Sequence, residues 1–206
     1  MENEAVRPPQ TEVTDLGMLK ALAHPRRQAI LQRLSVDGPA TSASLARDLG
    51  WNTGATSYHL RELARYGLVE DLPDRAHGRE RWWRQVPRDL RFPRRSQQTA
   101  EVRGIIDEMN RRGFTADLET FARVQAEADL DGEWGDAFPY SRGTIQVTLE
   151  ELVTFFEEYI ELVKRYQRPA EEAPEGSRLM LTRFFAFPAP THNTELSDGD
   201  ATASAI

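Results

Sequence analysis

In the first third of the chain, apolar positions recur with the period of short helices. Apolar residues recur at intervals of three and four within residues 14–23, 25–38, 41–49 and 52–65, which is the period of amphipathic helices. Pro25 suits the first turn of the second helix. The pattern therefore predicts four compact helices, each with one face turned inward.

The short connection between the third and fourth predicted helices is the central feature of this region. Gly50 suits the left-handed conformation that often follows a helix, and Asn52 or Thr53 can cap the next helix. A connection of three or four residues that contains glycine joins two helices at a steep angle. We therefore predict a helix-turn-helix.

The fourth predicted helix has two contrasting faces. Thr56, Leu60 and Leu63 share an uncharged face, which we expect to pack inward. The opposite face is small, polar and basic, and such a face suits the major groove of DNA. An ordinary solvated helix face would show the same pattern. The candidate DNA-binding residues here are Thr53, Gly54, Ser57, Tyr58, His59, Arg61 and Arg65, with packing as the alternative role for His59.

A hairpin pattern follows this helix. Residues 68–72 and 79–86 are predicted strands, and residues 73–78 form a cluster of turn formers between them. A hairpin directly after a helix-turn-helix is the wing of a winged helix, whose tip can contact phosphates or the minor groove. We expect at least one of Trp82 and Trp83 in the core. The candidate wing contacts are Arg75, His77, Arg79 and Arg81.

A second block of helical patterns follows a linker predicted at residues 87–96. Helices are expected at 97–112 and 115–129, and the sequence Thr148-Leu-Glu-Glu151 is a capping box that opens a helix reaching Val163. Strands are expected at 141–147 and 178–187. The fold class is therefore mainly α with small β: a winged helix-turn-helix at 13–92, then a helical or α+β domain at 97–188, between disordered tails at 1–12 and 189–206.

Charge is distributed unevenly along the chain. Residues 12–95 hold fifteen Lys and Arg against ten Asp and Glu, whereas residues 96–206 hold ten against twenty-one, so the net charge of −7 hides a basic first half. A basic first half fits a nucleic-acid partner. No long apolar stretch and no secretion signal are recognisable, so we expect a cytoplasmic protein without membrane contact.

The inventory of reactive residues argues against several classes of function. The chain has no cysteine, and His24, His59, His77 and His192 form no set with metal-ligand spacing. Phosphate-binding loops and nucleophile motifs are also missing. We therefore expect no enzyme activity, no metal and no cofactor.

Three stretches in the right order resemble the ArsR-type transcriptional regulators. Residues 19–31 are similar to the opening of those proteins, residues 57–69 to their recognition helix and the entry to the wing, and residues 78–83 to the returning wing strand. The resemblance implies a homodimer on a near-palindromic operator, paired through residues 15–23 and 97–112. Metal-sensing members often carry Cys-x-Cys on the helix before the recognition helix, and residues 43–49 depart from that pattern.

The sequence thus predicts a regulator that binds double-stranded DNA as a homodimer. For the second block two roles stay open, a dimerisation module or a sensor domain that binds a small-molecule or protein effector. A closed apolar cavity would favour a sensor. A flat apolar face matched across a two-fold axis would favour a dimer module.

Overall fold

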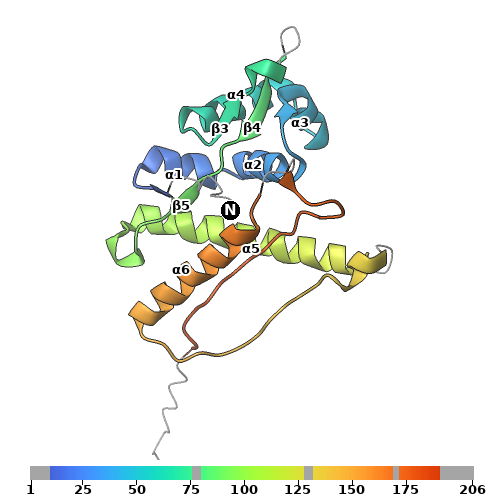
Figure 1. The fold of residues 1–206 in the computed structure, drawn as a ribbon. Helices are drawn as coiled ribbons and strands as arrows, with labels where there is room; N and C mark the ends of the chain where they lie inside the picture. The colour runs from blue at the N-terminus through green and yellow to red at the C-terminus, as the bar shows by residue number, and fades with distance from the viewer. Residues whose placement is uncertain (1–9, 76–79, 128–131, 169–171, 191–206) are drawn as a thin grey trace, which may run out of the picture. The chain divides into compact units, whose positions relative to one another are not determined.

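The computed structural model describes residues 10–75, 80–127, 132–168 and 172–190. The chain divides into two compact units, residues 1–172 and residues 173–206. All described helices and strands belong to the first unit (Figure 1). In chain order they are β1 Gln10–Glu12, α1 Leu16–Ala23, α2 Pro25–Asp37, β2 Ala40–Thr41, α3 Ser42–Asp48, α4 Thr53–Arg65, β3 Val69–Asp71, η1 Pro73–Arg75, β4 Trp82–Gln85, β5 Asp89–Arg91, η2 Arg95–Gln97, α5 Ala100–Ala126, η4 Gly132–Asp136 and α6 Leu149–Tyr166.

Side-chain caps fix where the first helices begin. Asp15 caps α1, since its carboxylate accepts hydrogen bonds from the backbone N–H of Gly17 at 3.1 Å and of Met18 at 3.0 Å. Thr41 caps α3 through a reciprocal capping box with Ser44. Such caps satisfy backbone donors that have no partner within the helix, so the helix boundaries follow from local sequence.

The three-stranded sheet has the order β2-β4-β3 and is antiparallel throughout. Ala40 pairs with Trp83, and Val69 pairs with Gln85. Trp83 is buried and Trp82 is half-buried, which confirms that one of the two tryptophans belongs to the core. The strands β3 and β4 form the hairpin expected for a wing.

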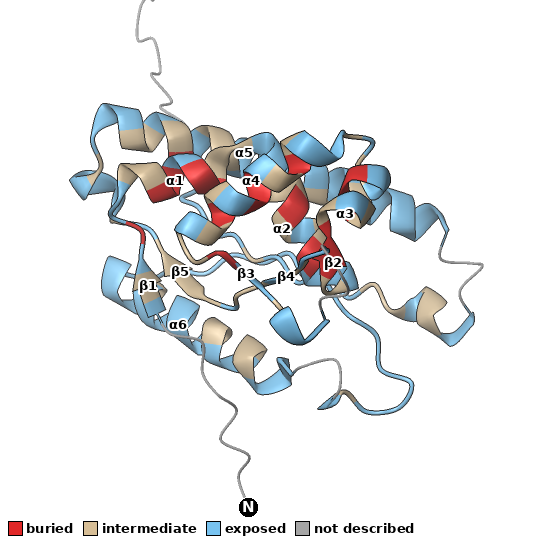
Figure 2. Ribbon diagram, turned by 90° about the horizontal axis from the view of Figure 1, so that it is seen from above, coloured by how far each residue is buried: buried red, intermediate tan, exposed pale blue. Residues whose placement is uncertain are grey.

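The core of the first unit lies between α1, α2, α3, α4 and the three-stranded sheet (Figure 2). Leu19, Ile30, Leu45, Leu60 and Leu63 are its largest fully buried leucine and isoleucine side chains. The N-terminal part of α5 packs on α1 and adds the buried Ile106 to the same core. The winged helix and the helix after the wing therefore share one core.

Two expectations near the ends of the winged helix need correction. Residues 10–12, expected in a disordered tail, form β1, and residues 89–91, expected in a linker, form β5; the two strands pair in parallel. The backbone N–H of Val13 also donates to the carbonyl oxygen of Arg91 at 2.8 Å, and Val13 is buried. Backbone pairing and this apolar anchor hold both segments in place.

The second block also departs from expectation. One continuous helix, α5, replaces the two helices expected at 97–112 and 115–129. Thr115 does not cap a new helix; its hydroxyl donates to the carbonyl oxygen of Arg111 at 2.9 Å within the continuing helix. Residues 141–147 and 178–187, expected as strands, have no regular secondary structure. The capping box of Thr148 and Glu151 is confirmed at the start of α6. The broad fold class, a winged helix-turn-helix followed by a mainly helical region, is confirmed.

Candidate DNA-binding surface

The turn between α3 and α4 has the geometry expected from its sequence. Gly50 adopts a φ of 67°, a left-handed conformation that glycine enters without steric cost. The N–H of Trp51 donates to the carbonyl oxygen of Ala46 at 2.8 Å, and Asn52 caps α4 by accepting from the N–H of Ala55 at 2.7 Å. These contacts set the direction in which α4 leaves α3.

The inner face of α4 is buried as predicted. Thr56, Leu60 and Leu63 are fully buried, and the hydroxyl of Thr56 donates to the carbonyl oxygen of Asn52 at 3.1 Å. A buried hydroxyl needs such a partner. This face anchors α4 to the core and leaves the opposite face to solvent.

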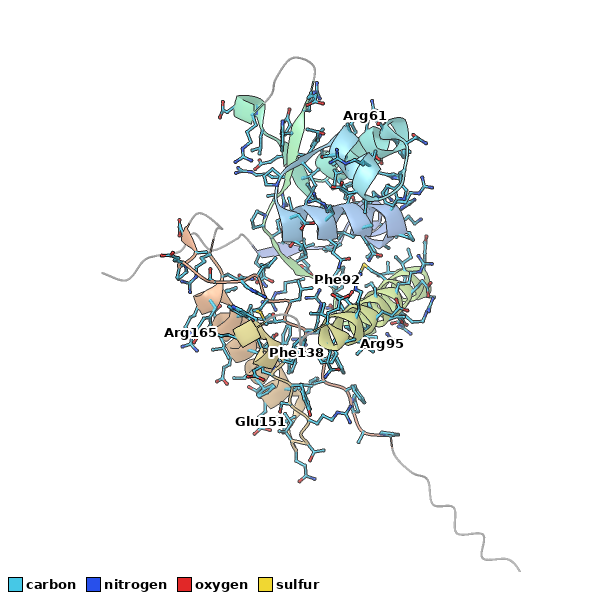
Figure 3. All side chains as sticks on the ribbon, turned by 90° about the vertical axis from the view of Figure 1, so that its right-hand side faces the viewer. Arg61, Phe92, Arg95, Phe138, Glu151 and Arg165 are labelled. Carbon is cyan, nitrogen blue, oxygen red and sulfur yellow. The ribbon has the colours of Figure 1, made fainter. Side chains whose placement is uncertain are left out.

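The outer face of α4 carries the polar and basic residues. Thr53, Gly54, Arg61 and Arg65 are exposed, and Ser57 is half-buried. Tyr58 is 52% exposed although its ring is large. Figure 3 marks Arg61 on this helix. The structure therefore gathers on one side of α4 the predicted contact residues of this helix except His59.

His59 is a candidate DNA contact with packing as the alternative role, and its position favours packing. Its side chain is only 6% exposed, because it lies three residues after Thr56 and four before Leu63, on the inner face. Its ring centroid lies 4.8 Å from that of His24 and 6.5 Å from that of Trp51. His59 therefore packs α4 against α2, and it is not part of the outward surface.

The wing is described in part. Arg75, at the end of the 3-10 turn η1, and Arg81, just before β4, are both exposed. His77 and Arg79 lie outside the described residues. Arg84 on β4 pairs across the hairpin with Glu70 on β3 at 2.6 Å, so this arginine stabilises the hairpin and carries a paired charge.

Arg26 is an exposed cation that the sequence reasoning did not include. It lies in the first turn of α2, and its guanidinium carbon is 5.3 Å from the ring centroid of Trp51, in the turn before α4. The aromatic ring holds the cation beside the N-terminal end of α4. Because Arg26 and Trp51 lie far apart in the sequence, no local sequence signal indicates this contact.

The part of the chain that the structure describes also bears on metal sites and membrane-spanning helices. No group of three or more His, Asp or Glu side chains is placed to hold a metal ion there. No described helix is long and apolar enough to cross a membrane.

Comparison with known proteins agrees with this geometry. Residues 22–71 match a model of a helix-turn-helix domain. The HTH-type transcriptional regulator YgaV of Escherichia coli (strain K12) is 42% identical over 59 residues, which make up 28% of this chain and 59% of that protein. The chain thus spans less than two thirds of the length of this curated relative.

Two solved structures are similar to this chain at lower sequence identity. Reduced HlyU from Vibrio cholerae N16961 is 27% identical, with 46% of this chain and 83% of that chain covered and a TM-score of 0.30. NolR from Sinorhizobium fredii is 24% identical, with 46% and 79% covered and a TM-score of 0.30. Superpositions at this level do not establish a shared overall fold. The sequence matches identify residues 22–71 as a helix-turn-helix domain.

Proposed function

We propose that this chain is a transcriptional regulator of the ArsR type that binds a near-palindromic operator in double-stranded DNA as a homodimer. The observation that carries the proposal is the outer face of α4. It is the second helix of a helix-turn-helix, and it turns Tyr58, Arg61 and Arg65 to solvent. The proposal implies a cytoplasmic protein, since its ligand is genomic DNA.

The composition of this face distinguishes it from an ordinary solvated helix surface. Gly54 and Ser57 are small, and a glycine inside a helix costs stability relative to alanine. Close approach to a sugar-phosphate backbone offsets that cost. Arg61 is long enough to reach base edges in the major groove, where arginine makes bidentate contacts with guanine. Arg65, Thr53 and Arg26 then serve as phosphate contacts that position the helix.

The wing supplies a second set of contacts. Arg75 and Arg81 are exposed at the two ends of the hairpin tip, and we assign them to phosphate or minor-groove contact together with His77 and Arg79. Each phosphate that an arginine neutralises releases counterions, which makes binding salt-dependent.

Besides the pairing expected through residues 15–23 and 97–112, the homodimer is supported by apolar surface beyond those ranges that the single chain leaves exposed. On α5, beyond the part that packs on α1, Phe114, Leu118 and Phe121 are exposed at spacings of four and three. On α6, Leu149 and Val153 are exposed at a spacing of four. Exposed apolar stripes of this kind mark association surfaces, and a two-fold dimer matches the symmetry of a near-palindromic operator.

These stripes favour the dimerisation role for the second block over the sensor role. A sensor domain needs a concave, largely enclosed apolar site, whereas these side chains of α5 and α6 are exposed. Binding of a small-molecule or protein effector by this block stays the alternative function. It would be favoured by a compound or protein that changes operator affinity.

Selection of duplexes from a random-sequence pool by the purified full chain tests the proposal. We expect a two-fold related consensus whose half-sites are separated by about one helical turn of DNA. The Arg61→Ala variant should fail to enrich that consensus, and the Arg165→Ala variant, which removes an exposed arginine of α6, should enrich it normally. Recovery of no consensus by the wild-type chain would contradict the proposal.

A further inference from the structure

Two histidines meet where the recognition helix α4 contacts the start of α2. The ring of His24, the residue before α2, lies 4.8 Å from the ring of His59 on α4, centroid to centroid. Arg26 and Arg27 on α2 and Trp51 in the turn complete the surroundings. We call this set of five side chains the histidine junction.

The hydrogen bonds of His24 require a neutral ring. Its Nδ1 accepts from the backbone N–H of Arg26 at 3.2 Å and so caps α2. A protonated imidazole has two N–H donors and no acceptor. Protonation therefore removes the cap, and it places a positive charge at the positive end of the α2 dipole.

The surroundings of His59 also disfavour a charged ring. Its side chain is buried, and among the described residues its Nδ1 has no hydrogen-bond partner. The charged groups that act on the ring are His24, Arg26 and Arg27 from the α2 side and Glu62 from α4 itself. Only Glu62 is negative, so a cation at His59 would be buried among like charges.

The shifts in pKa follow the same direction at both residues. Burial is the main cause that lowers the pKa of His24 below 6.5, with further lowering by Arg27 and Arg26 and a partial offset from a hydrogen bond with its own backbone. Burial also lowers the pKa of His59 below 6.5, followed by the charges of His24, Arg27 and Arg26, with Glu62 opposing them. Stability from this junction is therefore fully present above pH 6.5 and is lost as the pH falls through the lowered folded-state values.

We propose that the histidine junction is a pH-sensitive contact. In mildly acidic conditions, protonation of His24 and His59 weakens the packing of α4 against α2 and thereby weakens DNA binding. His59 adjoins the outward Tyr58 on α4, with 5.4 Å between their ring centroids. A change in how His59 packs therefore alters how α4 presents its outer face. The DNA part of the proposal rests on the proposed function, whereas the contact itself is testable without DNA.

Simple electrostatics predicts the opposite effect on DNA binding, which makes the proposal falsifiable. Added positive charge near the N-terminal end of α4 attracts phosphate, so protonation without loosening would strengthen binding as the pH falls. His24→Asn separates the two effects, since asparagine is a preferred helix cap that does not titrate. His192→Asn is the matched control, because it removes a histidine of the C-terminal segment outside the described residues.

The first measurement uses the free full chain. Protonated imidazole quenches a nearby indole, and the ring centroid of Trp51 lies 6.5 Å from that of His59. Tryptophan fluorescence and the midpoint of thermal unfolding should both fall from pH 8 to pH 5, with an apparent pKa below 6.5. Trp51→Phe should remove the fluorescence change, His24→Asn should reduce both changes, and His192→Asn should keep them. A fluorescence signal that does not titrate, or a His24→Asn chain that titrates like wild type, overturns the proposal.

The second measurement compares affinity for the duplex selected from the random pool at pH 7.5 and pH 5.5. Wild-type affinity should fall several-fold more from pH 7.5 to pH 5.5 than that of His24→Asn, because only the wild type loses a cap that titrates. A wild-type affinity that falls no more than that of His24→Asn, or that rises, overturns the proposal. Failure to bind any duplex at either pH would instead contradict the proposed function and leave the fluorescence test to decide.

Discussion

The guanidinium of Arg91 on β5 holds both carboxylate oxygens of Glu157 on α6, with N···O distances of 2.7 and 3.0 Å. Arg91 also donates twice to Asp89, and its guanidinium carbon lies 5.7 Å from the ring centroid of Phe156. Its side chain is only 20% exposed. These bonds raise the pKa of Arg91, first through Asp89 and then through Glu157. An ion pair between residues distant in sequence thus fastens α6 to the strand that follows the wing.

Glu157→Gln should weaken the attachment of α6 to β5, because it removes the charge and keeps the shape of the side chain, while the contacts of Arg91 with Phe156 and of Lys164 with Asp89 remain. The lost contact is worth about 1 kcal/mol at most, since Glu157 is half exposed. Amide hydrogen exchange across α6 should therefore become several-fold faster. Glu158→Gln, a neighbouring exposed carboxylate, is the control. Equal exchange in the two variants would show that the pair with Arg91 does not hold the helix.

Leu60→Ala should destabilise the winged helix strongly. The side chain is fully buried on the inner face of α4, and deletion of such a leucine costs roughly 2–5 kcal/mol. Leu179→Ala, which is 63% exposed, should cost much less. Chemical denaturation of both variants measures the difference, and similar losses would mean that the inner face of α4 is misassigned.

Gly54→Ala should separate stability from DNA binding. An added Cβ would meet only the Asn52 Oδ1 atom, at 3.4 Å. Alanine favours a helix interior over glycine by about 0.5–1 kcal/mol, and the gain should be smaller at Gly54, the second residue of α4. Stability should rise while affinity for the selected duplex falls, because the methyl group intrudes where the phosphate backbone approaches. Gly113→Ala, within α5 and with no atom within 4 Å of its added Cβ, should raise stability alone. Unchanged affinity in Gly54→Ala would argue against close approach at this position.

The full chain should sediment as a dimer at micromolar concentration. The monomer mass is 23.4 kDa, so the expected species has twice that mass. Leu118→Glu on α5 should shift the equilibrium toward monomer, since a buried unpaired charge is costly. A wild-type chain that sediments only at 23.4 kDa would remove the dimer from the proposed function.

The winged helix was predictable because its signals are local. Helix caps, the left-handed Gly50 and the apolar period of α4 each act within a few residues, and they agree with one another. The inward position of His59 was also predictable, since its spacing from Thr56 and Leu63 places all three side chains on the same face of the helix. A histidine beside basic residues nevertheless suggested a DNA contact.

The remaining parts of the fold depend on pairing between distant segments. Residues 10–12 and 89–91 contain no strong strand signal, and they become strands because each supplies the other's backbone partners. Residues 178–187 have strong strand propensity and yet form no strand. The two helices expected at 97–112 and 115–129 are one helix, and α5 continues through Gly113 because one glycine costs a helix only about 1 kcal/mol. Local propensity alone decides none of these three cases.

The most direct test of the central claim measures affinity of the wild type and Arg61→Ala for the selected duplex and for a random-sequence duplex at several salt concentrations. If Arg61 reads a base, its removal should cost roughly 1–3 kcal/mol on the selected duplex and less on the random one, so that the specificity ratio falls. Arg165→Ala should match wild type on both. If Arg61→Ala binds the selected duplex as tightly as wild type, the outer face of α4 is not the reading surface. If no duplex binds the wild type above background at low salt, the protein is not a DNA-binding regulator.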